Sequence, residues 1–152
     1  MTALRLSVAA LASLLVALPA AAQVTVTDPW IRGTVQGQMA TGAFMKLQSA
    51  KDARLVEARS PVAGVVEIHE MAMENNVMRM RAVKALDLPA GRAVELKPGG
   101  YHVMLMDLKQ QMKEGEVVPV TLVVESGGKR ETIDVKAPVR APTARSDMMK
   151  KH

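Results

Sequence analysis

The sequence contains no cysteine among its 152 residues. Disulfides, thiolate metal centres and the lipid-modified cysteine of a lipoprotein are therefore excluded. Aromatic residues are nearly as scarce, at 2% of the chain, and comprise Trp30, Phe44 and Tyr101. Nucleic-acid binding needs a basic stripe interleaved with stacking aromatics. The modest net charge of +5 and these three rings do not supply one, so we expect no nucleic-acid partner.

Long apolar stretches are also absent after residue 22. Before it, residues 6–18 are apolar apart from two serines, Arg5 precedes them, and three alanines ending at Ala22 follow. This order is typical of a cleaved signal peptide, and the run is short for an uncleaved anchor, which needs about 20 residues. We therefore expect residues 1–22 to be a signal peptide cleaved after Ala22. The mature protein would then lie in the periplasm without a membrane anchor.

From residue 23 onward the chain consists of short segments in which apolar and polar residues alternate, separated by glycine, proline and asparagine. Such segments are typical of strands, and their close spacing predicts an all-β sandwich or barrel. The expected strands cover residues 24–27, 43–48, 53–58, 64–73, 77–83, 93–96, 102–108, 117–124 and 130–135. The Asp28–Pro29 step is expected to end the first strand. We place one domain at residues 23–137 and a flexible tail at residues 138–152.

Asn75 and Asn76 predict a two-residue hairpin turn, because asparagine tolerates the positive φ that a type I′ turn requires. The resulting cross-strand pairs are Glu74 with Val77, Met73 with Met78, and Met71 with Met80. Side chains alternate between the two faces of a strand. One face then carries His69, Met71, Met73, Met78 and Met80, and the other carries Glu70, Glu74, Arg79 and Arg81. On the first face, His69 and Met80 are diagonal neighbours that can share one ion.

A second group of donors follows two glycines, Gly99 and Gly100, further along the chain. By the same alternation, one strand face carries His102, Met104 and Met106. Together with the first group, they would supply imidazoles and thioethers, a neutral and soft set that suits copper(I). Zinc and iron usually draw on thiolate or carboxylate ligands as well. A blue-copper electron-transfer centre is excluded, because it needs a thiolate.

Packing offers another interpretation of these methionines. A methionine on one strand face is more often part of the core than a metal ligand. This holds for each of four methionines taken alone: Met71, Met73, Met78 and Met106. A lone histidine is likewise more often structural. Two histidines that each lie two residues before a methionine on the same face are harder to explain by packing. The residues alone therefore favour a metal site on this face, without choosing its methionines.

The spacing of four donors resembles the motif of the PCu(A)C family of periplasmic copper chaperones: His69, Met80, His102 and Met104. Flanking sequence also matches, in the words VEIHEM, MRM, LPAG and KPGGYHVML, and the resemblance covers nearly the whole expected domain. It implies a cupredoxin-like Greek-key β-sandwich that binds one copper(I) through these four residues. The resemblance thus selects the ligands and leaves Met71 and the remaining methionines as lining.

The resemblance also implies a function. The protein would be a periplasmic copper(I) chaperone and not an enzyme, with copper and an acceptor protein as its partners. The acceptor would be a cytochrome c oxidase subunit or another copper chaperone. Some members of the family carry a C-terminal extension that takes copper(II), a role open here to the tail residues Met148, Met149 and His152.

Two other functions stay open at this point. A secreted copper-dependent redox protein or enzyme would need an open coordination position beside a general base. Glu70 and Glu74 are expected on the opposite face of the hairpin, where they could not serve as that base. A metal-free periplasmic interaction module would use the methionine face as an adaptable apolar contact.

Overall fold

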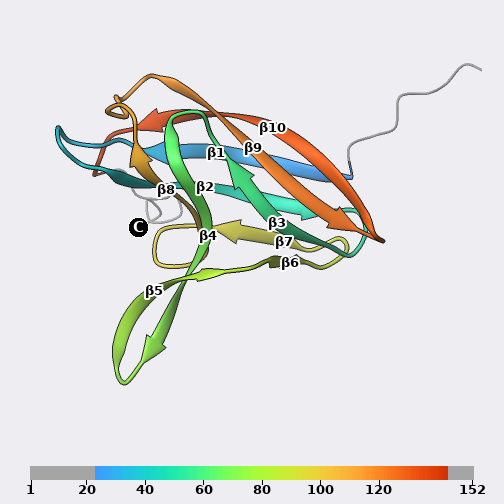
Figure 1. Cartoon of the computed structure of the whole chain (residues 1–152). Helices are drawn as coiled ribbons and strands as arrows, with labels where there is room; N and C mark the ends of the chain where they lie inside the picture. Colours follow the sequence, from blue (N-terminus) through green and yellow to red (C-terminus); the bar gives the residue numbers. More distant parts are fainter. Residues whose placement is uncertain (1–22, 144–152) are drawn as a thin grey trace, which may run out of the picture.

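The computed structural model describes residues 23–143, in which the chain forms ten strands and no helix (Figure 1). The strands are β1 (Val24–Arg32), β2 (Ala40–Ser49), β3 (Ala53–Arg59), β4 (Ala63–Glu74), β5 (Val77–Val83), β6 (Leu86–Leu88), β7 (Ala93–Leu96), β8 (His102–Leu108), β9 (Val117–Ser126) and β10 (Lys129–Arg140). The all-β expectation is confirmed. This range contains no helix that could cross a membrane. The predicted signal peptide and tail residues 144–152 lie outside the described residues.

The strands form two layers that share one junction. The first layer has the order β5-β4-β8-β2-β1, with β7 also paired to β2, and the second has the order β10-β9-β3-β6. The layers join where β1 and β10 run parallel, with Ile31 beside Val139 and Arg32 beside Arg140. The other strand pairings in the described range are antiparallel.

The hydrophobic core lies between the two layers and is built from alternate residues of each strand. In β8, Val103 and Leu105 are fully buried, and alternate residues of β9 in the second layer belong to the same core cluster. Because β8 turns these residues toward the core, its remaining residues from His102 to Met106 lie on the outer face of the first layer. The core packing therefore sets which side chains are available for a site.

Strand β1 continues through Asp28 and Pro29, where the sequence pattern predicts its end. A bulge between Thr27 and Trp30 accommodates the proline, and Asp28 takes a positive φ of 50°. The expected end at Thr27 is therefore wrong, because a bulge lets the strand resume its pairing with β2 on the far side.

The last strand also runs further than predicted, to Arg140. Ala137 and Val139 are buried in the core, so residues 138–140 belong to the sheet and not to the expected tail. The short strand Leu86–Leu88, which pairs with β3, has no counterpart among the predicted strands. Three residues are too few to display an alternation that sequence inspection can recognise.

The hairpin of β4 and β5 has the predicted register. Its pairs include Glu74 with Val77, Met73 with Met78, and Met71 with Met80. Asn75 and Asn76 have φ values of 50° and 63°, as a type I′ turn requires. On the charged face, Arg81 Nε donates a hydrogen bond of 2.7 Å to Glu70. The division of the hairpin into a methionine face and a charged face is confirmed.

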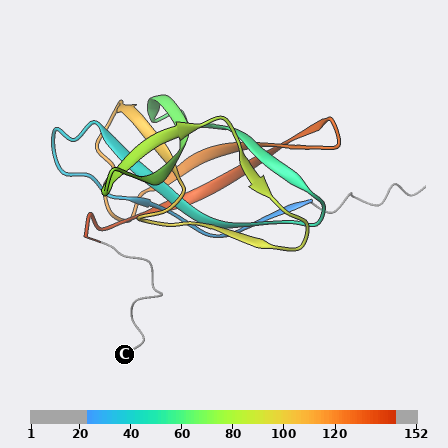
Figure 2. The same cartoon turned by 90° about the horizontal axis from the view of Figure 1, so that it is seen from below.

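Only part of this hairpin is attached to the sandwich. Strand β4 pairs with β8 as far as His69, and from there to the turn it pairs only with β5. The free end projects from the body in Figure 1, and Figure 2 shows it from below. The alternative interpretation of Met73 and Met78 as core residues is wrong. They are 63% and 47% exposed, because the ribbon extends past the strands that would cover it.

We predict that Leu105→Ala lowers the free energy of unfolding by about 2–5 kcal/mol, because it removes a fully buried side chain between the layers. Met106→Ala, at the half-buried neighbour on the outer face, should cost clearly less. Urea unfolding followed by the fluorescence of Trp30 measures both losses. Equal losses would contradict the assignment of the core and outer faces of β8.

Candidate metal centre

The predicted donors meet on the outer face of the first layer, where β8 lies between β4 and β2. His69 of β4 is directly opposite His102 of β8, and their ring centroids are 5.7 Å apart. Met104, two residues further along β8, lies opposite Glu67 on one side and Gly42 on the other. Strand pairing thus places two imidazoles and a thioether side by side.

His102 is 6% exposed and makes a contact at each ring nitrogen. Nδ1 lies 3.1 Å from the backbone oxygen of Gly100. Because a carbonyl oxygen can only accept, Nδ1 carries the proton of the neutral ring, which leaves a lone pair on Nε2. The sulfur of Met80 lies 3.0 Å from this Nε2. Two electron-pair donors from different strands therefore face each other.

His69 is also anchored through one ring nitrogen, but here the anchored nitrogen is Nε2 and the lone pair lies on Nδ1. Nε2 lies 2.8 Å from a carboxylate oxygen of Glu67. The ionised carboxylate accepts, so Nε2 donates and the lone pair lies on Nδ1. This Nδ1 is buried and has no hydrogen-bond partner within residues 23–143. Anchoring the far nitrogen to a carbonyl or carboxylate is the usual support of a metal-binding histidine.

The electrostatic environment keeps His102 in its neutral form. Burial lowers the pKa of His102 below its usual value, although the hydrogen bond to Gly100 opposes this effect. Repulsion from the charge of Arg32, and from His69 whenever that ring is protonated, lowers the pKa of His102 further. The ring is therefore neutral at neutral pH, the state in which its lone pair can bind a metal.

A pocket of about 260 Å³ opens beside these rings. Four possible donors are among the residues that line it: Met71, Met80, His102 and Met104. Gly42 also lines the pocket and leaves room for the ring of Phe44, which would lie 2.7 Å from a Cβ at that position. Three of the four predicted ligands thus line one pocket, and His69 lies next to them, opposite His102.

An aromatic row extends from this pocket along the first layer. The ring centroid of Phe44 lies 4.7 Å from that of Trp30 and 6.2 Å from that of His102. The guanidinium of Arg32 lies 5.4 Å from the centroid of Phe44 and also lines the pocket. The local sequence pattern assigns these residues no place at the site, because only the pairing of β1 with β2 brings them there.

Sequence reasoning missed Glu67. The residue lies two positions before His69, so strand alternation places both on one face, and this signal could have identified it. Its carboxylate holds the His69 ring, and its backbone lies opposite Met104. Glu67 therefore orients a donor at the site.

The donor set fits a soft, singly charged cation. The lone pair of His102 Nε2 and the sulfur of Met80 have no proton to share across their 3.0 Å contact. Residues 23–143 contain no group of three His, Cys, Asp or Glu that could hold a metal ion. A metal site on this face therefore depends on thioethers, which are ligands of soft metals.

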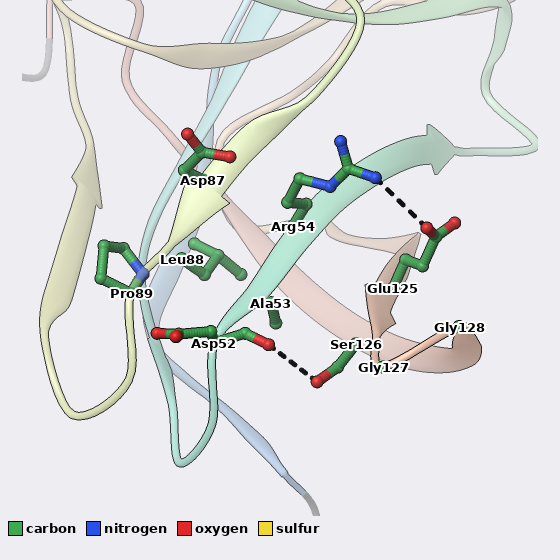
Figure 3. Close-up of a pocket in the computed structure, with 10 residues that line it drawn as sticks. All are labelled: Asp52, Ala53, Arg54, Asp87, Leu88, Pro89, Glu125, Ser126, Gly127 and Gly128. Atoms are coloured by element: carbon green, nitrogen blue, oxygen red, sulfur yellow. Dashed lines mark hydrogen bonds and ion pairs between the residues drawn. The ribbon is translucent and has the colours of Figure 1, made fainter.

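A larger pocket of about 520 Å³ lies at the opposite end of the sandwich, between β3, β6 and the turn that joins β9 to β10 (Figure 3). Several of its polar side chains are engaged within the protein. Arg54 pairs with Glu125 at 3.2 Å, and a carboxylate oxygen of Asp52 accepts from the backbone N–H of Ala90. The Ser126 hydroxyl donates to the backbone oxygen of Asp52.

The chain has relatives among families and curated proteins. The model of the family described as "Putative lipoprotein LpqE-like" matches residues 24–139. The chain is also 33% identical over 132 residues to "Putative lipoprotein Lxx21020" of Leifsonia xyli subsp. xyli. That match covers 81% of this chain and 78% of the relative.

Solved structures share the fold. The copper-bound PCuAC domain from PmoF2 is 25% identical with a TM-score of 0.65, over 82% of this chain and 97% of that domain. The solution structure of CuI-DR1885 from Deinococcus radiodurans is 31% identical with a TM-score of 0.59, over 76% of this chain and 78% of that one. The cupredoxin-like β-sandwich implied by the sequence resemblance is confirmed.

We predict that Glu67→Ala weakens the binding of a soft monovalent metal, with silver(I) as the probe, by about tenfold. Loss of the carboxylate frees His69 to rotate and to change tautomer. Glu70→Ala is the matched control, since Glu70 pairs with Arg81 on the opposite face of β4, and it should leave the affinity unchanged. A competition titration with a silver(I) chelator measures both. Equal affinities of Glu67→Ala and the wild type would show that the carboxylate does not orient a ligand.

Proposed function

The chain belongs to the LpqE-like family and has the fold of PCuAC domains. On this premise we propose that it is a copper chaperone, a protein that binds copper and passes it to an acceptor. Two solved structures with this fold are described as copper-bound or copper(I)-bound, which supports copper as the cargo. The observation that carries the proposal is the contact of 3.0 Å between His102 Nε2 and the Met80 sulfur. Two lone-pair donors at this distance gain from a cation that both can bind.

The cargo is copper(I), held by His69, Met80, His102 and Met104. Imidazole and thioether donors are neutral and soft, and such a set favours the monovalent ion. The lone pair on His69 Nδ1, buried and without a hydrogen-bond partner in the described range, supports its inclusion among the ligands.

Release proceeds by stepwise exchange of ligands. Met80 is 48% exposed, whereas His102 is buried, so an acceptor's ligand displaces the Met80 sulfur first. A thiolate-rich acceptor binds copper(I) more strongly than thioethers do, which gives the transfer its direction. Copper stays monovalent throughout, so only coordinate bonds form and break.

The site is better suited to carrying copper than to catalysing a reaction with it. Of the three carboxylates on β4, Glu67 is bonded to His69, and Glu70 and Glu74 pair with Arg81 on the other face. None of them is free to act as the general base that a copper enzyme would use. A metal-free interaction module would not require two lone pairs at one pocket.

The carrier works in the periplasm, exported by a signal peptide at residues 1–22 and cleaved after Ala22. Export agrees with a relative named as a lipoprotein, although this sequence has no cysteine to carry a lipid. Its domain covers residues 23–137 together with the end of β10, and the acceptor is the copper centre of cytochrome c oxidase or another copper chaperone. A second, copper(II) site in the tail would use Met148, Met149 and His152, which lie outside the described residues.

Titration with copper(I) under reducing, oxygen-free conditions tests the proposal. We expect one tightly bound copper(I) for each protein. His102→Ala and Met80→Leu should each lower the affinity at least about 100-fold, or about 2.7 kcal/mol. Met106→Leu, on the same strand face, is the control and should bind as the wild type does. Absence of tight binding, or wild-type affinity in both site variants, would refute the chaperone assignment, and catalysed oxygen consumption would favour a redox enzyme.

X-ray absorption at the copper edge counts the ligands directly. The one-to-one complex should show two sulfur and two nitrogen neighbours, and Met104→Leu should reduce the sulfur count to one. Met71→Leu is the matched control, since Met71 lines the same pocket without being a proposed ligand. Loss of a sulfur neighbour in Met71→Leu, with none lost in Met104→Leu, would replace Met104 by Met71 in the ligand set.

A further inference from the structure

The free end of the β4–β5 hairpin carries a methionine pair that the site does not use. Met73 and Met78 are direct cross-strand partners, and both are largely exposed. They lie beyond His69, the last residue of β4 that pairs with β8. The tip of the hairpin projects from the body of the protein (Figure 1), and both of its methionines are exposed there.

The register brings these two side chains close together. In an antiparallel hairpin, pairs that exchange backbone hydrogen bonds alternate with pairs that do not. Glu74 and Val77 close the two-residue turn and are of the first kind, so Met73 and Met78 are of the second. In such a pair the Cα atoms are about 4.5 Å apart and the side chains are nearest. Two flexible thioethers can then close on one ion.

Packing does not account for the pair. Where methionine serves the core of this protein it is buried, as Met45 and Met112 are. A cross-strand pair that stabilises an exposed ribbon is typically β-branched or aromatic. Met73 and Met78 have neither the burial nor the residue type that a purely structural role favours.

The row of methionines on this face continues from the tip toward the pocket. Met71 and Met80 are the next pair on the same face, about 7 Å along the strands, and both line the pocket beside His102. The charged residues of the ribbon lie on the other face, where Arg81 pairs with Glu70. The thioether face is thus a continuous row of soft donors.

We propose that Met73 and Met78 form a second, weaker binding site for copper(I) at the tip of the hairpin. This inference rests on the proposed function, since it takes the same ion as cargo. Two thioethers hold copper(I) more weakly than the four donors at the pocket, so the tip fills second and empties first. Its exposed position lets an approaching protein reach this ion before it reaches the pocket. The ion is bound and released as copper(I), with no change of oxidation state.

The test follows the methyl resonances of methionine in the full chain by NMR, during titration with copper(I) under reducing conditions. The first equivalent should shift the Met80 and Met104 methyl groups, and the second should shift those of Met73 and Met78. The double variant Met73→Leu with Met78→Leu should take the first equivalent with wild-type affinity and lose the second. Met39→Leu, which removes an exposed thioether outside the hairpin, should keep both.

The second site is refuted if the double variant still binds two equivalents, or if the Met73 and Met78 methyl groups do not shift in the wild type. Wild-type affinity for the first equivalent in the double variant shows that the variant is folded. The chaperone assignment is refuted by a different result, namely that the Met80 and Met104 methyl groups do not shift. His102→Ala gives the converse measurement, because it should retain the shifts at the tip while losing those at the pocket.

Discussion

The pairing of His69 with His102 across β4 and β8 is the contact on which the rest of the site depends. It sets two imidazoles side by side on the outer face, while Ile68 and Val103, the adjacent pair, are buried in the core. Burial of a large apolar side chain contributes about 1.5–3 kcal/mol, so the packing that holds this register also holds the donors. A register slip of one residue in either strand would turn its imidazole into the core.

Two acceptors behind the rings decide what the histidine pair can bind. The oxygen of Gly100 and the carboxylate of Glu67 each hold the proton of one ring nitrogen, and the opposite nitrogens keep their lone pairs. Burial favours the neutral form of His102 by lowering its pKa. The donors near the pocket are thus neutral, and the Glu67 carboxylate is already bonded to His69. This balance suits a soft monovalent ion better than a dication, which would keep more of its charge uncompensated.

Much of this arrangement could be predicted from local rules. The type I′ turn at Asn75 and Asn76 follows from their tolerance of positive φ, and strand alternation then divides the hairpin into its two faces. The exposure of Met73 could not be predicted, because alternation says which residues share a face and not whether another layer covers it. The continuation of β1 past Pro29 was hidden for a similar reason, since a bulge is stabilised by the neighbouring strand.

The sequence by itself determined the fold class, the hairpin register and the grouping of histidines with methionines, since each depends on residues close together in the chain. Resemblance to a known family then selected four of those residues as ligands. Only the tertiary structure decided that His69 meets His102, that the Met80 sulfur reaches the ring of His102, and that the hairpin tip stands free. These features depend on contacts between strands distant in sequence, where burial and hydrogen-bond partners are set by the packing of the whole sandwich.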